Sequence, residues 1–306
     1  MWFEGEVHVR DFANKIKENI LAQGAWVEIS SKPGGNDAAK PNGTDWDTDD
    51  GWVFHSLGSS LNDKIFVGMN PSYLSNNFSN WYHGHKFFIA EDYTPNITPG
   101  ENGYFTNQIW EYLKVHSGNG HAEMYEDTAT IKYAMSVTAD RIIIAVRNPY
   151  YYNSYKIRNF IYLGLMKRYS EETDSTAAVI GAAQAINYNT YNSVRVLKDA
   201  RLDMAQSYNV LNSEIVDNYS KAYGDKFKAI NVPLGKSTEG LRGELDGVLC
   251  ARFYNNIGAV GRTHSEEGRV MIDGKEYIVI HRPYAHLGHC NFSSLSTDFN
   301  FFIEVK

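Results

Sequence analysis

The sequence has little cysteine, no block of basic residues and no long apolar run, and each shortage excludes a class of protein. Its 306 residues hold two cysteines, Cys250 and Cys290, which cannot build a disulfide framework. We expect both thiols to be reduced and packed, and a single bridge between them is the alternative. The 29 Lys and Arg residues are outnumbered by 36 Asp and Glu residues and form no long cluster. Binding to a nucleic-acid backbone needs a clustered positive surface, so we expect no sequence-specific nucleic-acid binding.

Segments that would cross a membrane or direct export are also missing. No stretch approaches about 18 consecutive apolar residues, the length of a membrane span. Residues Met1 to Glu6 do not show a basic region followed by an apolar run. We therefore expect a protein that is made in a cytoplasm, has no membrane partner, and stays in solution or assembles there.

The sequence also lacks the common catalytic motifs. It has no glycine-rich loop ending in Gly-Lys-Ser/Thr, and no Gly-x-Gly-x-x-Gly after a predicted strand. Ser56 to Ser60 combine serines with a glycine but do not form Gly-x-Ser-x-Gly, so we interpret them as hairpin residues. Paired carboxylates for glycoside hydrolysis stay open, because their separation is a spatial quantity. We predict no enzymatic activity, no catalytic residue and no cofactor.

Two clusters contain residue types that bind metals, but neither has the residue spacing of a known metal-binding motif. Three imidazoles and one thiol fall within ten residues, and zinc favours such nitrogen and sulfur ligands. They are His281, His286, His289 and Cys290. Their spacing matches no standard zinc finger, and we expect solvated or hydrogen-bonded imidazoles rather than a metal site. The acidic run Asp45 to Asp50 lacks the glycine and glutamate of a hand-type calcium loop, so we expect a solvated loop.

What the sequence does have is a succession of strand patterns. Apolar-rich or alternating runs predict strands at 25–29, 51–55, 64–69, 131–137, 141–146, 160–166, 245–254, 269–272, 276–281 and 299–305. Asp273-Gly274 marks a hairpin, and Gly164 inside a strand predicts a close approach of another chain segment. Helical spacing predicts helices at 7–23 and 105–115, and less clearly at 195–223.

These elements predict a β-rich α+β fold, with sandwich-like antiparallel sheets, an N-terminal helix and a few further helices. We expect one elaborated domain over 1–306. The alternative is an N-terminal lobe over 1–190 and a C-terminal lobe over 191–306.

Tyrosine is abundant, with 21 residues in an aromatic content of 14%, and it suits half-buried sheet faces and subunit interfaces. The polar loop 32–50 has one large aromatic residue, and the link 148–155 is rich in tyrosine. A neighbouring subunit would fix such loops. The interface candidates are Trp46, Tyr150, Tyr151 and Tyr152.

One stretch resembles a known class of proteins. Ser136 to Arg147, SVTADRIIIAVR, precedes Phe160 to Tyr169, FIYLGLMKRY. The pair resembles structural proteins of tailed bacteriophages, in which a strand of the form small-x-Arg-Ile-Ile-Val leads through a tyrosine-bearing link to Tyr-Leu-Gly. Gly24-Ala25-Trp26, and the segment 51–58 leading to 64–68, agree with that class. The resemblance implies a virion component of the tail, neck or baseplate, with no catalytic residue.

We therefore predict a structural virion protein that forms a ring or decoration in the neck, collar or tail. Its partners would be further copies of itself in a symmetric homo-oligomer and other virion proteins. One alternative is a baseplate or tail-tip protein that binds a receptor or carbohydrate, with Trp46, Trp81 and Tyr82 stacking on sugar rings. A polysaccharide-acting virion enzyme is a further, less favoured alternative.

Overall fold

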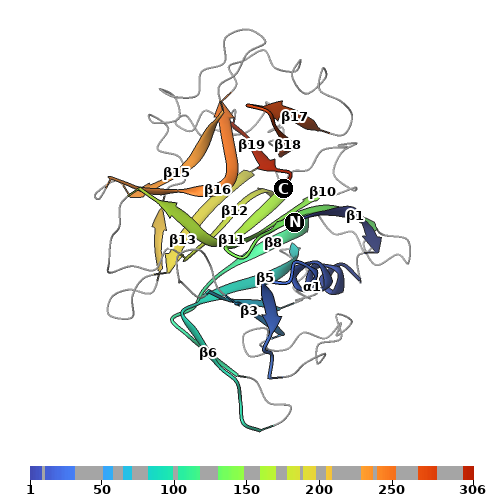
Figure 1. Ribbon diagram of the computed structural model, residues 1–306, viewed down its shortest axis with the longest axis vertical. Helices are drawn as coiled ribbons and strands as arrows, with labels where there is room; N and C mark the ends of the chain where they lie inside the picture. Colours follow the sequence, from blue (N-terminus) through green and yellow to red (C-terminus); the bar gives the residue numbers. More distant parts are fainter. Residues whose placement is uncertain are drawn as a thin grey trace.

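Antiparallel strands make up most of the structure, a computed structural model of the chain (Figure 1). It describes residues 1–8, 11–31, 51–57, 65–70, 82–98, 103–117, 130–147, 159–169, 178–186, 189–197, 205–208, 229–236, 240–252, 268–280 and 299–306. These ranges contain nineteen strands, β1 to β19, and one helix, α1. The predicted β-rich fold with antiparallel sheets and an N-terminal helix is confirmed.

The largest sheet has twelve strands, and its first part runs in the order β1-β9-β10-β11-β12-β13-β14. These strands are β1 (Trp2–His8), β9 (Thr130–Val137), β10 (Arg141–Arg147), β11 (Asn159–Arg168), β12 (Ala178–Ile186), β13 (Asn189–Leu197) and β14 (Ala205–Tyr208). Strands β9, β10 and β11 form the expected meander of consecutive antiparallel strands. The alternative domain boundary at 190/191 falls within β13, and the choice between one domain and two stays a prediction.

The end of β11 leaves its first neighbours and pairs with β16, which begins the second part of the sheet. From β16 the order continues β19-β18-β17, while β15 pairs along another part of β16. The strands are β15 (Ile230–Lys236), β16 (Gly240–Arg252), β17 (Arg269–Ile272), β18 (Lys275–Ile280) and β19 (Phe299–Glu304). The sheet curls until Arg269 of β17 reaches Glu4 of β1, with 2.5 Å between Nη2 and Oε2.

A second sheet of five strands packs against the large one, in the order β2-β3-β4-β5-β8. Its strands are β2 (Trp26–Glu28), β3 (Trp52–Ser56), β4 (Phe66–Asn70), β5 (Tyr82–Ala90) and β8 (Ile109–Ser117). Strand β8 lies against β11, β12 and β13, and β5 lies against β12, which gives the sandwich-like arrangement. A two-stranded sheet of β6 (Asp92–Thr94) and β7 (Tyr104–Thr106) extends from this unit.

Helix α1 (Phe12–Ala22) forms because its apolar residues recur every three or four positions, and it packs beside β1, β2 and β9. Phe12, Ile16 and Ile20 on this face are fully buried. The predicted start at Val7 is wrong, because residues 2–8 pair as a strand with β9.

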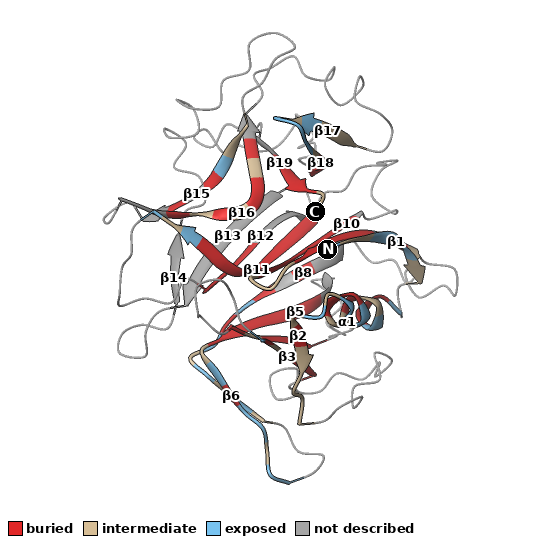
Figure 2. Cartoon of the chain, viewed as in Figure 1, coloured by how far each residue is buried: buried red, intermediate tan, exposed pale blue. Residues whose placement is uncertain are grey.

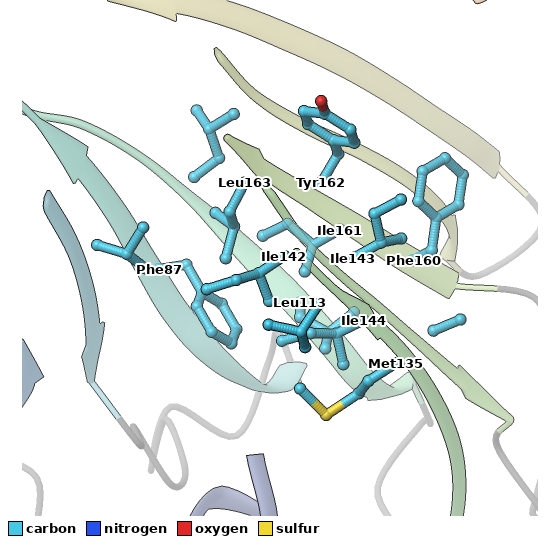
Figure 3. Close-up of a cluster of buried hydrophobic side chains, with 14 of the residues drawn as sticks. Phe87, Leu113, Met135, Ile142, Ile143, Ile144, Phe160, Ile161, Tyr162 and Leu163 are labelled. Atoms are coloured by element: carbon cyan, nitrogen blue, oxygen red, sulfur yellow. The ribbon is translucent and has the colours of Figure 1, made fainter. Parts of the chain in front are cut away.

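The main core lies between the two sheets and continues into the curl of the large one. Figure 3 shows Phe87 and Leu113 of the five-stranded sheet pointing toward Met135, Ile142 and Ile144 of the large sheet. On the other side of the meander, Phe160 of β11 meets Phe301 of β19 with ring centroids 5.3 Å apart. Strands β10 and β11 are therefore buried on both faces (Figure 2), which accounts for their almost continuous apolar runs.

The structure confirms the predicted close approach at Gly164. This residue lies in β11 at φ +153°, and a Cβ there would lie 2.6 Å from Cα of Arg141. The predicted hairpin at Asp273-Gly274 is also confirmed. It joins β17 to β18 with φ of 49° and 78°, the positive values that a two-residue type I′ turn requires.

Two predicted helices are wrong where the structure describes them. Residues 104–106 and 109–117, within and around the predicted helix 105–115, are strands β7 and β8. Residues 195–197 belong to β13 and residues 205–208 to β14, and the rest of 195–223 lies outside the described residues. In the described part of the chain, α1 is the only helix, so none of the further helices we expected is found there.

Cys250 is free and fully buried, two residues before the end of β16. It pairs with Ile230 of β15 on one side and Phe301 of β19 on the other. Burial raises the pKa of its thiol to about 12. Cys290 lies outside the described residues.

Candidate functional site

The most exposed apolar surface in the described residues belongs to the arm formed by β6 and β7, which projects from the five-stranded sheet (Figure 1). The arm follows β5 directly and pairs Asp92 with Thr106 and Thr94 with Tyr104. At its base the amide of Glu91 donates to the carbonyl of Thr106 over 3.2 Å. Nδ2 of Asn107 donates to the carboxylate of Glu91 over 2.6 Å, at the point where the chain turns into β8.

Tyr93 and Phe105 attach the arm to the body. The Tyr93 hydroxyl lies 2.8 Å from Oγ of Ser31, in the segment after β2. The ring of Phe105 stacks on Phe88 of β5, with centroids 5.6 Å apart. Phe105 also lies over Gly68 of β4, where a Cβ would come 2.6 Å from its ring. The base of the arm is therefore fixed against strands β4 and β5 and against the segment that follows β2.

Beyond this base much of the arm is exposed (Figure 2), and its exposed residues include large apolar ones. Ile97 is 97% exposed and Tyr104 is 68% exposed. Among the described residues of the arm, 92–98 and 103–107, only Asp92 carries a charge. Large exposed apolar groups with few charges around them are typical of a surface that contacts another molecule.

Trp110 of β8 extends this surface at the root of the arm, with 36% of its area exposed. The buried ammonium of Lys86 lies 4.6 Å from the centroid of its ring and 5.0 Å from that of Phe88. These distances are those of cation–π contacts, which hold the indole in place. We call Ile97, Tyr104 and Trp110 the arm surface.

A polar cluster lies inside the molecule, at the corner where β11 passes from the first part of the large sheet to the second. Arg141 is fully buried, and its Nε donates to Asp246 over 2.8 Å while its Nη1 donates to Oγ of Ser136 over 3.0 Å. Its other terminal nitrogen lies against Gly247, in the space that a side chain at that position would fill. Lys167 reaches the second oxygen of Asp246 over 2.7 Å.

Burial pushes the pKa of Asp246 upward, but hydrogen bonds from Lys167 and Arg141 outweigh it, so the pKa lies below its ordinary value. Asp246 is thus held as a carboxylate whose oxygens are both engaged by cations. Such an arrangement fixes the geometry of a corner and offers no available base or nucleophile.

Of the residues that the sequence analysis selected as candidate sites, Tyr82 is described, as the first residue of β5, and the others lie outside the described residues. This holds for the interface candidates Trp46, Tyr150, Tyr151 and Tyr152, and for the metal candidates His281, His286, His289 and Cys290. In the part that the structure describes, no three His, Cys, Asp or Glu side chains gather closely enough to hold a metal ion. The one helix found there has 11 residues, too few for a transmembrane span.

The arm surface was not among the predicted sites, although the sequence carries a signal for it. Tyr93-Thr94 and Tyr104-Phe105-Thr106 flank a stretch rich in proline, asparagine and glycine, which is the pattern of a hairpin. The prediction of a helix at 105–115 obscured that signal and placed Trp110 on a helix face.

Comparison with protein-family models finds no match, and comparison with curated proteins finds no significant similarity.

Proposed function

We propose that this chain is a non-enzymatic structural component of a tailed-phage virion. It forms a ring or decoration in the neck, collar or tail, and the arm surface contacts the neighbouring subunit. The observation that carries the proposal is the projecting arm, which exposes Ile97 and Tyr104. The phage-like pattern at 136–147 and 160–169 supports the virion assignment.

The arm has the properties of an assembly element. A two-stranded ribbon is at most marginally stable in water, and each strand here has three residues. Burying an exposed apolar side chain contributes roughly 1.5–3 kcal/mol, so contact of Ile97 and Tyr104 with a neighbour would stabilise both the arm and the assembly. A ring needs such a heterologous contact, in which a projection of one subunit meets a different surface of the next.

The arm contact is tested by light scattering and electron microscopy of the purified chain over a wide concentration range. We expect the unaltered chain to form closed rings at high concentration. A double variant, Ile97→Asp with Tyr104→Asp, should stay monomeric. Met271→Asp is the matched control, because Met271 is 63% exposed on β17 and lies outside the arm, and this variant should assemble normally.

A chain that stays monomeric throughout, or an arm variant that assembles like the control, would contradict the arm contact. The virion assignment has its own test, mass spectrometry of virions purified from cells that produce the chain. We expect a fixed copy number per particle, and absence from the virions would contradict the assignment.

Carbohydrate binding at a tail tip is the second candidate, and the exposed indole of Trp110 favours it, because aromatic rings stack on sugars. The two functions predict different effects of Trp110→Ala. Loss of binding to a glycan array with assembly retained would favour the carbohydrate-binding protein. Loss of assembly without any glycan binding would favour the structural role.

A further inference from the structure

His85 of β5 lies in an apolar junction between helix α1 and the two sheets. Its side chain is 4% exposed and contacts Phe12, with ring centroids 5.4 Å apart. On the other side, Phe12 contacts Tyr133 of β9 at 5.8 Å. The ring of Phe12 therefore links the imidazole of the five-stranded sheet to a phenol of the large sheet, and α1 spans the junction.

The surroundings of His85 favour the neutral imidazole over the protonated one. Nδ1 is buried and has no hydrogen-bond partner in the described part of the chain, whereas an imidazolium has two N–H groups to satisfy. Burial lowers the pKa of His85 to about 4. Phe12 is the first residue of α1, where the helix dipole is positive and Asp11 makes no side-chain capping bond. A positive charge beside this helix end is further disfavoured.

Other ionisable groups near the junction do not offset that charge. On α1, Lys15 pairs with Glu18, and Lys17 pairs with Glu28 of β2. On β5, Lys86 lies over Phe88 and Trp110. Strands β4 and β12, which flank or cover β5, contain no ionisable residue. The remaining groups are Asp11 before α1, Tyr82 and His83 on β5, Glu4, Glu6 and His8 on β1, Lys132 and Tyr133 on β9, and Glu111, Tyr112, Lys114 and His116 on β8.

Glu111 is the only carboxylate of β8, and it lies opposite Phe87, two residues along the strands from the His85–Leu113 pair. Burial of the imidazole is the cause of the lowered pKa of His85.

We propose that His85 is an acid-sensitive lock on helix α1: protonation of the imidazole releases the helix from the junction of the two sheets. The released state exposes Phe12, Ile16 and Ile20 together with the sheet surface that they cover. The lock is independent of the assembly role, since it uses none of the residues of the arm surface.

The pH dependence of the opening of α1 follows from the difference in proton affinity of His85 between the closed and open states. The closed state binds the proton more weakly than the open state, in which the imidazole has its ordinary pKa of 6.5. Closure is therefore fully stabilised above pH 6.5 and weakens as the pH falls toward 4. Between pH 7 and pH 5 the opening equilibrium rises about twentyfold.

Hydrogen exchange of the full chain, corrected for the intrinsic pH dependence of exchange, measures this opening. We expect the protection of the α1 amides to fall about twentyfold between pH 7 and pH 5, relative to the amides of β10. His85→Phe keeps an aromatic ring against Phe12 and cannot be protonated, so it should abolish the fall. His55→Leu, at a histidine stacked on Phe66 of β4 in the same sheet, should leave the fall intact.

Three results would overturn the lock: unchanged protection of α1 at pH 5, an equal loss in α1 and β10, or the same loss in the His85→Phe variant. A titration of the His85 ring by nuclear magnetic resonance in the unaltered chain keeps the test decisive if that variant does not fold. A midpoint near 6.5 would contradict the proposal, and a midpoint near 4 would support it.

Discussion

Gly164 shows how one residue sets the geometry around it. The strand β11 passes so close to the start of β10 at this point that a side chain would overlap the backbone of Asp140 and Arg141. Only glycine avoids both the overlap and the strain of φ +153°. The sequence predicted this approach because a glycine inside an apolar strand often marks a place where another backbone or side chain comes close.

Gly164→Ala should lower the free energy of unfolding by about 3 kcal/mol, through overpacking and backbone strain together. Gly24→Ala is the matched control, because Gly24 also has a positive φ, of 86°, but has open space around its Cα. It should cost only about 1 kcal/mol. Denaturant titration of both variants makes the comparison, and equal losses would show that the approach at Gly164 carries no energetic weight.

The buried Arg141–Asp246 pair should behave differently from ion pairs at the surface. Asp246→Asn leaves a buried guanidinium without its counter-charge, so we expect a loss of about 3 kcal/mol. Glu4→Gln, which breaks the exposed pair with Arg269, should cost less than about 0.5 kcal/mol. Adding Arg141→Met to Asp246→Asn should recover part of the loss, because it removes the unpaired charge. The same titrations test this, and additive losses in the double variant would contradict the pairing.

At the scale of elements, the sequence predicted ten of the nineteen described strands, and both predicted helices beyond α1 overlap strands where the structure describes them. Phe105, Ile109 and Leu113 recur every four residues, which fits one face of a helix. Side chains alternate between the two faces of a strand, so residues four positions apart also share a face there. Ile109 and Leu113 lie on one face of β8 in this way. Pairing of β8 with β5, whose partner residues lie 20 to 35 positions earlier in the chain, decides between helix and strand, and local spacing cannot reveal that pairing.

The same limit applies to the start of α1. Residues 7 and 9 continue the helical spacing backwards, yet residues 2–8 pair with 130–136 of β9. That partner lies more than 120 residues away and leaves no trace in the local pattern. The arm surface was missed for another reason. Long polar loops and tyrosine-rich links stand out in composition, whereas each strand of the arm has only three residues.

The arm should depend on Phe105 for its position. Phe105→Ala removes the stack on Phe88 and leaves a gap over Gly68, so we expect a loss of about 2 kcal/mol, less than for a fully buried phenylalanine. Limited proteolysis should then cut the arm more quickly than in the unaltered chain. Thr106→Ala, at the exposed neighbouring position, serves as the control and should change neither quantity. Equal cleavage in all three chains would mean that Phe105 does not hold the arm.

At the scale of the whole molecule, the sequence predicted the class of the fold and not its strand order. The meander of β9, β10 and β11 could be foreseen because its strands are consecutive. The insertion of β16 between β11 and β19, and the return of β1 to β9, join segments that are remote in sequence. Sheets with such distant pairings close large loops before they gain contacts, so we expect slow folding.

The buried thiol of Cys250 makes the unfolding rate of this architecture measurable by chemical modification. A reagent can modify its thiol only after β16 separates from β15 and β19, and only through the thiolate, which the raised pKa makes scarce in the native state. In a Cys290→Ser background, we expect modification to proceed at the rate at which the whole molecule unfolds, and to accelerate in denaturant by the same factor. Rapid modification of the folded chain would instead mean that β16 opens separately. A single sulfur atom thus measures the kinetic lifetime of the native state.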